Sequence, residues 1–198
     1  FDIVGSYRRG MADSGDIDII ITSPDDDKTA FNGFLDALIE QKIVTHVLSR
    51  GAHKSLTIAK LPGMKHSRRV DFLYTSPKEY PFAILYFTGS KIFNTIMRQR
   101  ALDMGYSLNE HGLYKMISGK KGAMIQNDFP TEKSIFDFLK MKYKSPEERK
   151  DGRAVQDLEV STIIPVKSVK TKTVKKPTKL KSASVAVSYT HLTLPTIV

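Results

Sequence analysis

The sequence predicts an α+β fold, with a larger mixed sheet-and-helix region over residues 1–77, a smaller α+β subdomain over residues 78–150, and a basic tail. Two patterns support this class. Short runs rich in β-branched residues indicate strands, and longer runs with apolar residues at helical spacing indicate helices. Apolar residues make up 40% of the chain, which is enough to build a core and excludes a wholly disordered protein.

The first region alternates strand and helix patterns. We predict strands over residues 1–4, 17–22, 44–48, 55–61 and 69–74. A loop is predicted over residues 23–28, where Pro24 precedes three Asp, and the apolar residues of 29–41 share one helical face. Because few of these strands are linked through helices, we expect a twisted, mixed sheet with helices on one face.

The second region begins with a helical pattern over residues 81–105, which is broken at a Thr-Gly-Ser tripeptide. Short strands are predicted over residues 108–125. A final amphipathic helix is predicted over residues 131–142, and Thr131 and Ser134 are its candidate caps.

The composition changes after residue 150. Residues 167–181 contain seven Lys and no acidic residue, so we expect a disordered basic tail over residues 151–187. Residues 188–198 resemble the translated read-through of a sequencing adapter, and we expect them to be a sequence artefact. The chain starts at Phe1 inside a strand pattern, which predicts an internal fragment of a longer protein.

The net charge of +10, from 31 basic and 21 acidic residues, predicts a polyanionic partner such as nucleic acid or an anionic membrane, or else a solvated surface. Cysteine is absent, which excludes disulfides, thiolate zinc sites and a cysteine nucleophile. No apolar run approaches the ~20 residues that cross a bilayer, and no secretory signal is recognisable. We therefore expect an intracellular protein with no membrane partner.

Two runs near the N-terminus carry the chemistry, G-S-Y-R-R-G at residues 5–10 and S-G-D-I-D at residues 14–18. Side chains two residues apart on a strand share a face, so Asp16 and Asp18 present two carboxylates to one side. Two such carboxylates repel each other unless a cation lies between them. Oxygen ligands with no Cys or His nearby suit Mg²⁺ or Mn²⁺ rather than zinc.

The residues around this pair favour a phosphate-bearing substrate. Gly5 and Ser6 can offer N–H groups and a hydroxyl to phosphate oxygens, and Arg9 can clamp a phosphate. A third acid, Asp71, lies in the apolar strand pattern of residues 69–74. If that strand neighbours the one with the first two acids, the three carboxylates reach two metal ions ~3.5–4 Å apart, which supports nucleotidyl transfer. A D-x-D pattern by itself is weak evidence for catalysis, because it is common on surface strands.

The series G-S-Y-R-R-G, S-G-D-I-D, R-R-V-D and Y-F-T-G-S resembles, in order and with few gaps, the motif series of the family X DNA polymerases, and it is most similar to the polymerase beta type. The resemblance covers residues 1–153. It implies a nucleotidyltransferase palm over residues 1–77 and a nascent-base-pair-binding subdomain over residues 78–150. It also implies a cis peptide bond between Gly89 and Ser90.

The resemblance further implies the roles of individual residues. The implied catalytic residues, which are also ligands of two Mg²⁺ ions that Mn²⁺ can replace, are Asp16, Asp18 and Asp71. The implied nucleotide-binding residues are Gly5, Ser6, Arg9, Ser14, Gly15, Tyr86, Phe87, Gly89 and Asn94. The implied DNA contacts are Lys54, Arg69 and Arg98. The Tyr-Phe pair differs from the Gly-Trp of template-independent terminal transferases, which favours template-directed synthesis.

The implied activity is that of a DNA-directed DNA polymerase, which adds a deoxynucleotide to a primer 3′ end by a two-metal mechanism, in gap filling during base excision repair. The implied partners are primer–template or gapped DNA and a dNTP, and the implied state is a monomer, nuclear in a eukaryote. Two alternatives stay open. One is another nucleotidyltransferase of the same superfamily, terminal-transferase-like or acting on RNA or protein; the other is a non-catalytic DNA-binding fragment.

The resemblance also implies a helical lyase domain and a helix-hairpin-helix region ahead of Phe1, neither of which this sequence contains. Those regions would supply further DNA and triphosphate contacts. We therefore expect the fragment to keep the catalytic site and to bind gapped DNA poorly.

Overall fold

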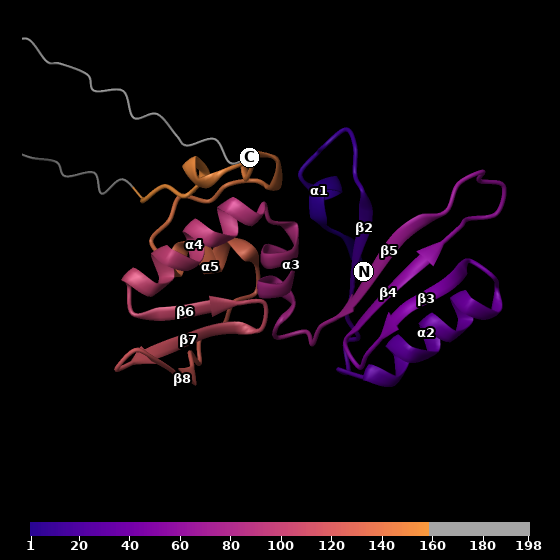
Figure 1. The fold of residues 1–198 in the computed structure, drawn as a ribbon. Helices are drawn as coiled ribbons and strands as arrows, with labels where there is room; N and C mark the ends of the chain where they lie inside the picture. Colours follow the sequence, from indigo (N-terminus) through magenta and orange to yellow (C-terminus); the bar gives the residue numbers. More distant parts are fainter. Residues whose placement is uncertain (159–198) are drawn as a thin grey trace, which may run out of the picture. The chain divides into compact units, whose positions relative to one another are not determined.

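A five-stranded mixed sheet forms the first part of the computed structural model, which describes residues 1–158 (Figure 1). The strand order is β1-β2-β5-β4-β3. The bounds are β1 (Asp2–Ile3), β2 (Asp16–Ile21), β3 (Val44–Arg50), β4 (Lys54–Ala59) and β5 (Arg68–Tyr74). Only the β2–β5 pair within this sheet is parallel. The α+β class expected from the sequence is confirmed.

Helix α2 (Lys28–Glu40) covers one face of this sheet, beside β3 in Figure 1. It begins where the Asp27 side chain accepts a hydrogen bond from the Thr29 N–H at 2.8 Å, an N-cap that satisfies one otherwise unpaired donor. Its buried side chains, Phe31 and Leu35, join a core that includes Phe72 of β5. This packing fixes the position of α2 against the sheet.

The other face of the sheet also meets a helix. Ile20 of β2 and Leu73 of β5 are buried with Ala83 and Ile84 of α3 (Tyr80–Thr88). The expectation of helices on one face is therefore wrong. Successive residues of a strand point to opposite faces, and both faces of β2 carry isoleucines, so each face needs an apolar cover.

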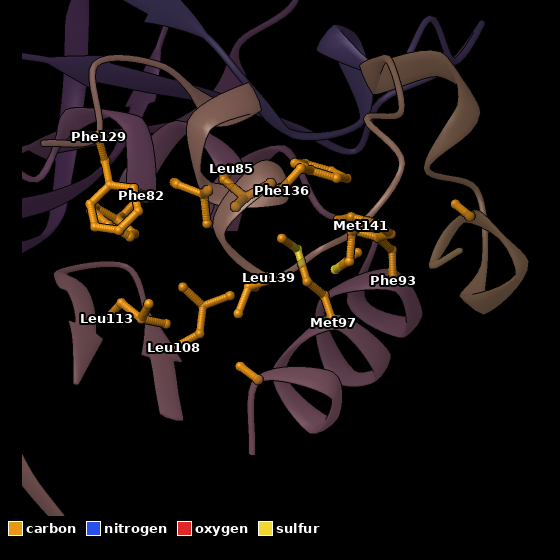
Figure 2. Close-up of a cluster of buried hydrophobic side chains, with 13 residues drawn as sticks. Phe82, Leu85, Phe93, Met97, Leu108, Leu113, Phe129, Phe136, Leu139 and Met141 are labelled. Atoms are coloured by element: carbon orange, nitrogen blue, oxygen red, sulfur yellow. The ribbon is translucent and has the colours of Figure 1, made fainter. Parts of the chain in front are cut away.

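A second hydrophobic core lies between the following elements and is drawn in Figure 2. Its side chains come from α3, α4 (Lys91–Asp103), β6 (Tyr106–Asn109), β7 (Gly112–Ile117), α5 (Glu132–Phe138) and nearby connections, and β8 (Lys120–Met124) pairs with β7 beside it. The three strands form an antiparallel sheet in sequence order. The predicted helix break before α4 is confirmed, because Gly89 has φ +68° and the Ser90 side chain caps α4 by accepting from the Phe93 N–H.

The predicted caps of α5 are confirmed. Thr131 and Ser134 form a capping box, in which each side chain accepts a hydrogen bond from the other residue's backbone N–H. The helix ends at Phe138, four residues before the predicted end. Lys140 has φ +54°, a left-handed conformation that cannot continue an α-helix.

The folded part extends beyond residue 150, where the tail was expected to begin. Two 3₁₀ turns follow α5, η1 (Pro146–Glu148) and η2 (Gly152–Ala154). Asp157 forms a β-bridge with Met141 and an ion pair with Arg100 of α4 at 2.7 Å. These contacts order residues 151–158, so the expectation of disorder is wrong for that stretch. The remaining tail and the expected artefact over 188–198 lie outside the described residues.

Two smaller features complete the fold. The four-residue helix α1 (Gly5–Arg8) lies between β1 and β2, where the sequence patterns predicted no helix. Over residues 1–158, no helix combines the length and apolar character that crossing a membrane would require.

Candidate active site

Two neighbouring strands bring the three acids together. The register of the parallel pair β2–β5 aligns Asp16 with Arg69 and Asp18 with Asp71. Because side chains alternate along a strand, these four lie on one face, and Ile17 and Ile19 of β2 pack against the core on the other face. The condition on which the three-acid site depended, that the two strands are neighbours, is met.

The three carboxylates form one cluster. Asp16, Asp18 and Asp71 can each place an oxygen within 4.8 Å of the others. Asp71 is 3% exposed, and the other two are half-buried. Burial raises the pKa of Asp18, and the negative charges of Asp16 and Asp71 raise that pKa further. Three repelling oxygen donors at this spacing fit a divalent cation such as Mg²⁺ or Mn²⁺.

Two basic side chains hold Asp71 in place. Arg69 forms a bidentate pair, with Nε–Oδ1 at 2.9 Å and Nη2–Oδ2 at 3.0 Å. The Lys54 Nζ, which β4 brings to the same face, lies 3.8 Å from Asp71 Oδ2. The sequence placed both basic residues among the DNA contacts and did not foresee these ion pairs. The Arg69 side chain is 45% exposed, so it is free to move away when another cation or a primer approaches.

Gly5 supports the acidic cluster from α1. It has φ +65°, and a Cβ atom built at this position would lie 2.4 Å from Asp18 Oδ2. Both facts require glycine, because an L side chain is strained at that φ and would collide with the carboxylate. The glycine of the G-S motif thus lets α1 approach the second acid.

A pair of serines connects α1 to the start of β2. The Ser6 and Ser14 hydroxyls are 2.7 Å apart, and the Ser14 hydroxyl donates to the Asp16 carbonyl oxygen at 2.5 Å. Gly15, next to them, is exposed, and no atom lies within 4 Å of the place where its Cβ would be. The structure therefore groups these predicted phosphate contacts beside the acids, with open space above Gly15.

A second group of predicted site residues surrounds the break between α3 and α4. The Arg9 Nη1 donates to the Thr88 carbonyl oxygen at 2.5 Å, and the Asn94 side-chain amide donates to the Tyr86 carbonyl oxygen at 2.6 Å. The Tyr86 and Phe87 rings pack edge to face at 5.1 Å. The Gly89–Ser90 peptide bond is cis, as the resemblance implied.

Arg98 and Phe87 are the other predicted residues near this break. Arg98 is exposed on α4 and shares a small cavity with Tyr86 and Asn94. Phe87 is half-buried against the core that contains Ile20 and Leu73, so it also has a packing role. Arg98 makes no hydrogen bond to another predicted site residue within residues 1–158.

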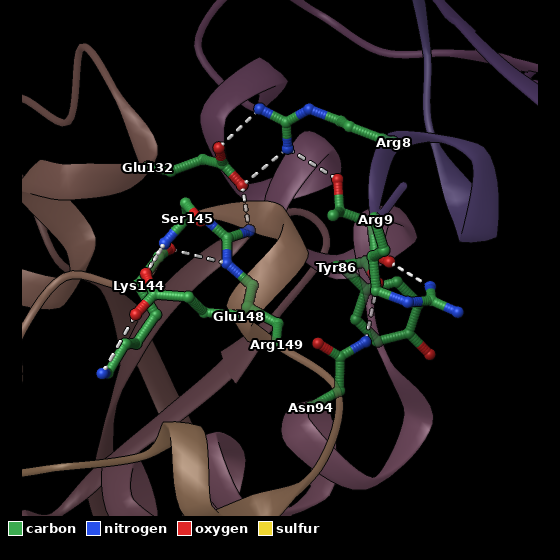
Figure 3. A network of polar contacts seen from close by, with 10 residues as sticks. Arg8, Arg9, Tyr86, Asn94, Glu132, Lys144, Ser145, Glu148 and Arg149 are labelled. Atoms are coloured by element: carbon green, nitrogen blue, oxygen red, sulfur yellow. Dashed lines mark hydrogen bonds and ion pairs between the residues drawn. The ribbon is translucent and has the colours of Figure 1, made fainter. Parts of the chain in front are cut away.

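The sequence did not identify an ionic network that joins α1 to α5 (Figure 3). Arg8 makes a bidentate pair with Glu132, with Nη1–Oε1 at 3.0 Å and Nη2–Oε2 at 2.7 Å, and also donates to the Thr88 hydroxyl. The fully buried Arg149 donates to Glu132 Oε1 at 2.6 Å. Burial alone would raise the pKa of Glu132, but hydrogen bonds and charge from both arginines outweigh it and hold the pKa below its ordinary value.

Comparisons with known proteins give two family matches and several relatives. Residues 1–77 match the family described as the DNA polymerase beta palm, and residues 83–150 match the DNA polymerase beta thumb. DNA polymerase lambda of Rattus norvegicus is 37% identical over 158 residues, which cover 73% of this chain and 28% of that protein.

Two further relatives support the same grouping. DNA polymerase lambda of Arabidopsis thaliana is 32% identical over 162 residues, covering 73% of this chain and 31% of its own length. The DNA polymerase/3′-5′ exonuclease PolX of Bacillus subtilis (strain 168) is 26% identical over 156 residues, which cover 79% of this chain and 25% of that protein. The chain therefore spans about a quarter to a third of the length of these relatives.

Proposed function

This chain belongs to the family X DNA polymerases, and on that premise we propose that it is the catalytic part of a DNA-directed DNA polymerase. In the proposed reaction the primer 3′-oxygen attacks the α-phosphorus of a dNTP. The bond between the α-phosphorus and its bridging oxygen breaks, and pyrophosphate leaves. The observation that carries the proposal is the alignment of Asp18 with Asp71 on parallel strands, beside Asp16.

In this proposal the three acids hold the reacting groups. A divalent cation bound there would lower the pKa of the attacking hydroxyl and neutralise charge on the phosphates. Asp16 and Asp18 would supply its oxygen ligands. The pKa of Asp18 is raised first by burial and then by repulsion from Asp16 and Asp71, and such a cation would relieve this repulsion. Asp71 would take the proton of the 3′-hydroxyl, after Arg69 moves from its carboxylate toward the primer.

The other groups would orient the nucleotide and the DNA. Ser6, Arg9, Ser14 and Gly15 would contact the triphosphate. Tyr86, Phe87, Gly89 and Asn94 would lie under the sugar and base, and Lys54, Arg69 and Arg98 would contact DNA. We also propose Mg²⁺ as the physiological metal, action as a monomer, and gap filling in base excision repair in the nucleus of a eukaryotic cell.

Primer extension tests this function. We expect the protein, with Mg²⁺ and one dNTP at a time, to add only the nucleotide complementary to the template. Losing a residue that merely orients a metal ligand costs 10–100-fold, so Asp71→Asn should lower the rate by more than about 100-fold. Asp25→Asn, which removes the same charge from an exposed loop, should leave the rate unchanged.

The same assay separates the alternatives. Addition without a template would place the activity with the terminal transferases. Extension that survives Asp71→Asn would contradict the assigned mechanism. Failure of the wild-type chain to extend any primer, alone and with the upstream residues of a family relative joined to it, would support a non-catalytic DNA-binding protein.

A further inference from the structure

The segment between Glu40 and Asp71 is unusual in its charge. Residues 41–70 contain seven Lys or Arg and no acidic residue, a local net charge of +7 within the folded part. This segment forms β3, β4 and the first three residues of β5, with their connections. A run of positive charge of this length favours binding of a polyanion beside the proposed metal site.

Some of these charges are already neutralised and others are not. Arg50 pairs with Asp36 at 2.6 Å, while Lys54 and Arg69 pair with Asp71. The other four basic residues, which make no ion pair anywhere in residues 1–158, are Lys42, Lys60, Lys65 and Arg68. Three of those four lie in residues 60–68, a stretch that is exposed throughout and that we call the β4–β5 basic loop.

The β4–β5 basic loop leads directly into the acidic site. Arg68 begins β5, and Arg69 already contacts Asp71. A strand rises about 3.3 Å per residue, so Arg68 lies about 10 Å and Lys65 at most about 20 Å from Asp71 along the strand direction.

The strand order sets the direction in which a primer must run. The proposed triphosphate contacts on α1 and before β2 lie on the β1–β2 side of Asp71. A primer whose 3′ end meets Asp71 must therefore leave the site toward β5 and β4. The β4–β5 basic loop connects those two strands.

We propose that the β4–β5 basic loop binds the phosphate backbone of the duplex upstream of the primer terminus. This inference rests on the polymerase function proposed above. One strand of DNA rises about 3.4 Å per nucleotide, so the reach of about 10–20 Å corresponds to about three to six nucleotides behind the 3′ end. Lys60 and Lys65 are the contacts that this reach assigns. Lys60 lies an even number of residues after Lys54, which faces Asp71, whereas Arg68 is the strand neighbour of Arg69 and points to the opposite face. An anionic membrane is less consistent, because the positive run ends at the face where the primer end must lie.

The test measures DNA binding directly. A fluorescently labelled primer–template, with duplex extending beyond about six upstream nucleotides, is titrated with protein over a series of salt concentrations. Each phosphate contact contributes about 0.9 to the slope of log affinity against log salt, so Lys60→Ala/Lys65→Ala should reduce the slope by about 2. The rate of insertion at saturating DNA should not change, because neither residue touches the reacting groups.

A matched control removes the same charge elsewhere. Lys115 and Lys120 are exposed on the three-stranded sheet, and Lys115→Ala/Lys120→Ala should keep the wild-type slope. Replacing the third to sixth upstream primer phosphates with neutral methylphosphonates should lower wild-type affinity and remove the difference between wild type and Lys60→Ala/Lys65→Ala. Both variants should unfold at the wild-type temperature, since all four side chains are exposed.

The outcomes are distinguishable. An unchanged slope in the loop variant, an equal loss in the control variant, or no effect of the neutral phosphates would each overturn the proposed loop contact while leaving the polymerase function intact. A wild-type protein that binds primer–template with no salt dependence, and does not extend it, would overturn both.

Discussion

Asp18 and Asp71 occupy aligned positions on two hydrogen-bonded parallel strands, with their carboxylates on one face of the sheet. The pairing forces two negative charges together, with Asp16 as a third, and burial raises the pKa of Asp18 first of all. The arrangement is unfavourable for the metal-free protein, and a divalent cation would relieve it. Stability and metal binding should therefore respond in opposite directions when one acid is neutralised.

The substitution Asp18→Asn tests this relationship. It removes one charge from the cluster with little change in shape, so we expect the metal-free protein to unfold about 2–4 °C higher, equivalent to about 1 kcal/mol. It should also lose the stabilisation that Mg²⁺ or Mn²⁺ gives the wild type, because a ligand is gone. Thermal unfolding with and without each metal measures both effects.

A control separates this effect from a general change in charge. Asp25→Asn, in the exposed loop before α2, should keep the metal-induced stabilisation. If Asp18→Asn gains as much stability from Mg²⁺ as the wild type, the acidic cluster is not the metal site.

The close approach of Gly5 to Asp18 yields a second prediction. In Gly5→Ala the new methyl group would lie 2.4 Å from Asp18 Oδ2, and the backbone φ of +65° would be strained, at a cost of about 1–3 kcal/mol. A displacement of about 1 Å at a reacting group can lower the rate by about 100-fold, so primer extension should fall by one to two orders of magnitude. Rate and unfolding temperature are measured on the same preparation.

Gly33→Ala is the matched control for Gly5→Ala. Gly33 lies inside α2, with no atom within 4 Å of its would-be Cβ. Alanine there should stabilise the helix by about 1 kcal/mol and leave the rate unchanged. Normal activity in Gly5→Ala would show that the Asp18 carboxylate can move without consequence.

Local features of this fold were predictable from the sequence because their causes are local. The two-residue spacing put Asp16 and Asp18 on one face, and the Thr131–Ser134 capping box follows from residues three apart. The pairing of β2 with β5 has no such local signal. From the residues alone, this pairing was only a condition for the three-acid site. The resemblance to the family X motif series turned the condition into an expectation.

The ionic network was missed for the same physical reason. Arg8, Glu132 and Arg149 come from three distant segments, and each has an ordinary local explanation. A Glu in the first turn of a helix reads as a favourable helix-dipole residue, and an Arg within a Glu-Glu-Arg-Lys-Asp run reads as exposed. The order of residues 151–158 was missed likewise, because the partner of Asp157 is Arg100 on α4.

Glu132 gives a prediction about pH. Its pKa is lowered in the folded protein by Arg8 and Arg149, despite burial. A carboxyl with a depressed folded pKa stabilises the protein above its unfolded pKa of about 4.3, and that contribution is lost as the pH falls through the lower folded pKa. At neutral pH Glu132→Gln should cost about 3 kcal/mol, because it leaves buried positive charge unpaired.

Urea unfolding at several pH values measures this contribution. The difference in free energy of unfolding between wild type and Glu132→Gln should be largest at neutral pH and should shrink below about pH 4. Glu40→Gln, an exposed acid of α2, should differ little from wild type at any pH. A wild-type–Glu132→Gln difference that is constant with pH would mean that the network stabilises through packing alone.

The last prediction concerns the link between α1 and the segment before α4. The Arg9 Nη1 donates to the Thr88 carbonyl oxygen at 2.5 Å, and a Cβ on Gly89 would lie 3.2 Å from the same nitrogen. In the proposed function this guanidinium holds the triphosphate and the sugar-facing segment in one geometry. Arg9→Lys keeps the charge but loses the planar fork of donors. The KM for the dNTP should rise about tenfold, equivalent to about 1.4 kcal/mol, while kcat changes much less.

Steady-state insertion kinetics with a single dNTP measure this split. Arg50→Lys is the control, since the Arg50 guanidinium also donates a short hydrogen bond, to Asp36, an acid of α2 that does not belong to the proposed site. Its KM and kcat should match the wild type. A fall in kcat for Arg9→Lys with an unchanged KM would contradict this role, because binding of the nucleotide in the ground state would then be intact. Arg9 would instead act on the bond-breaking step.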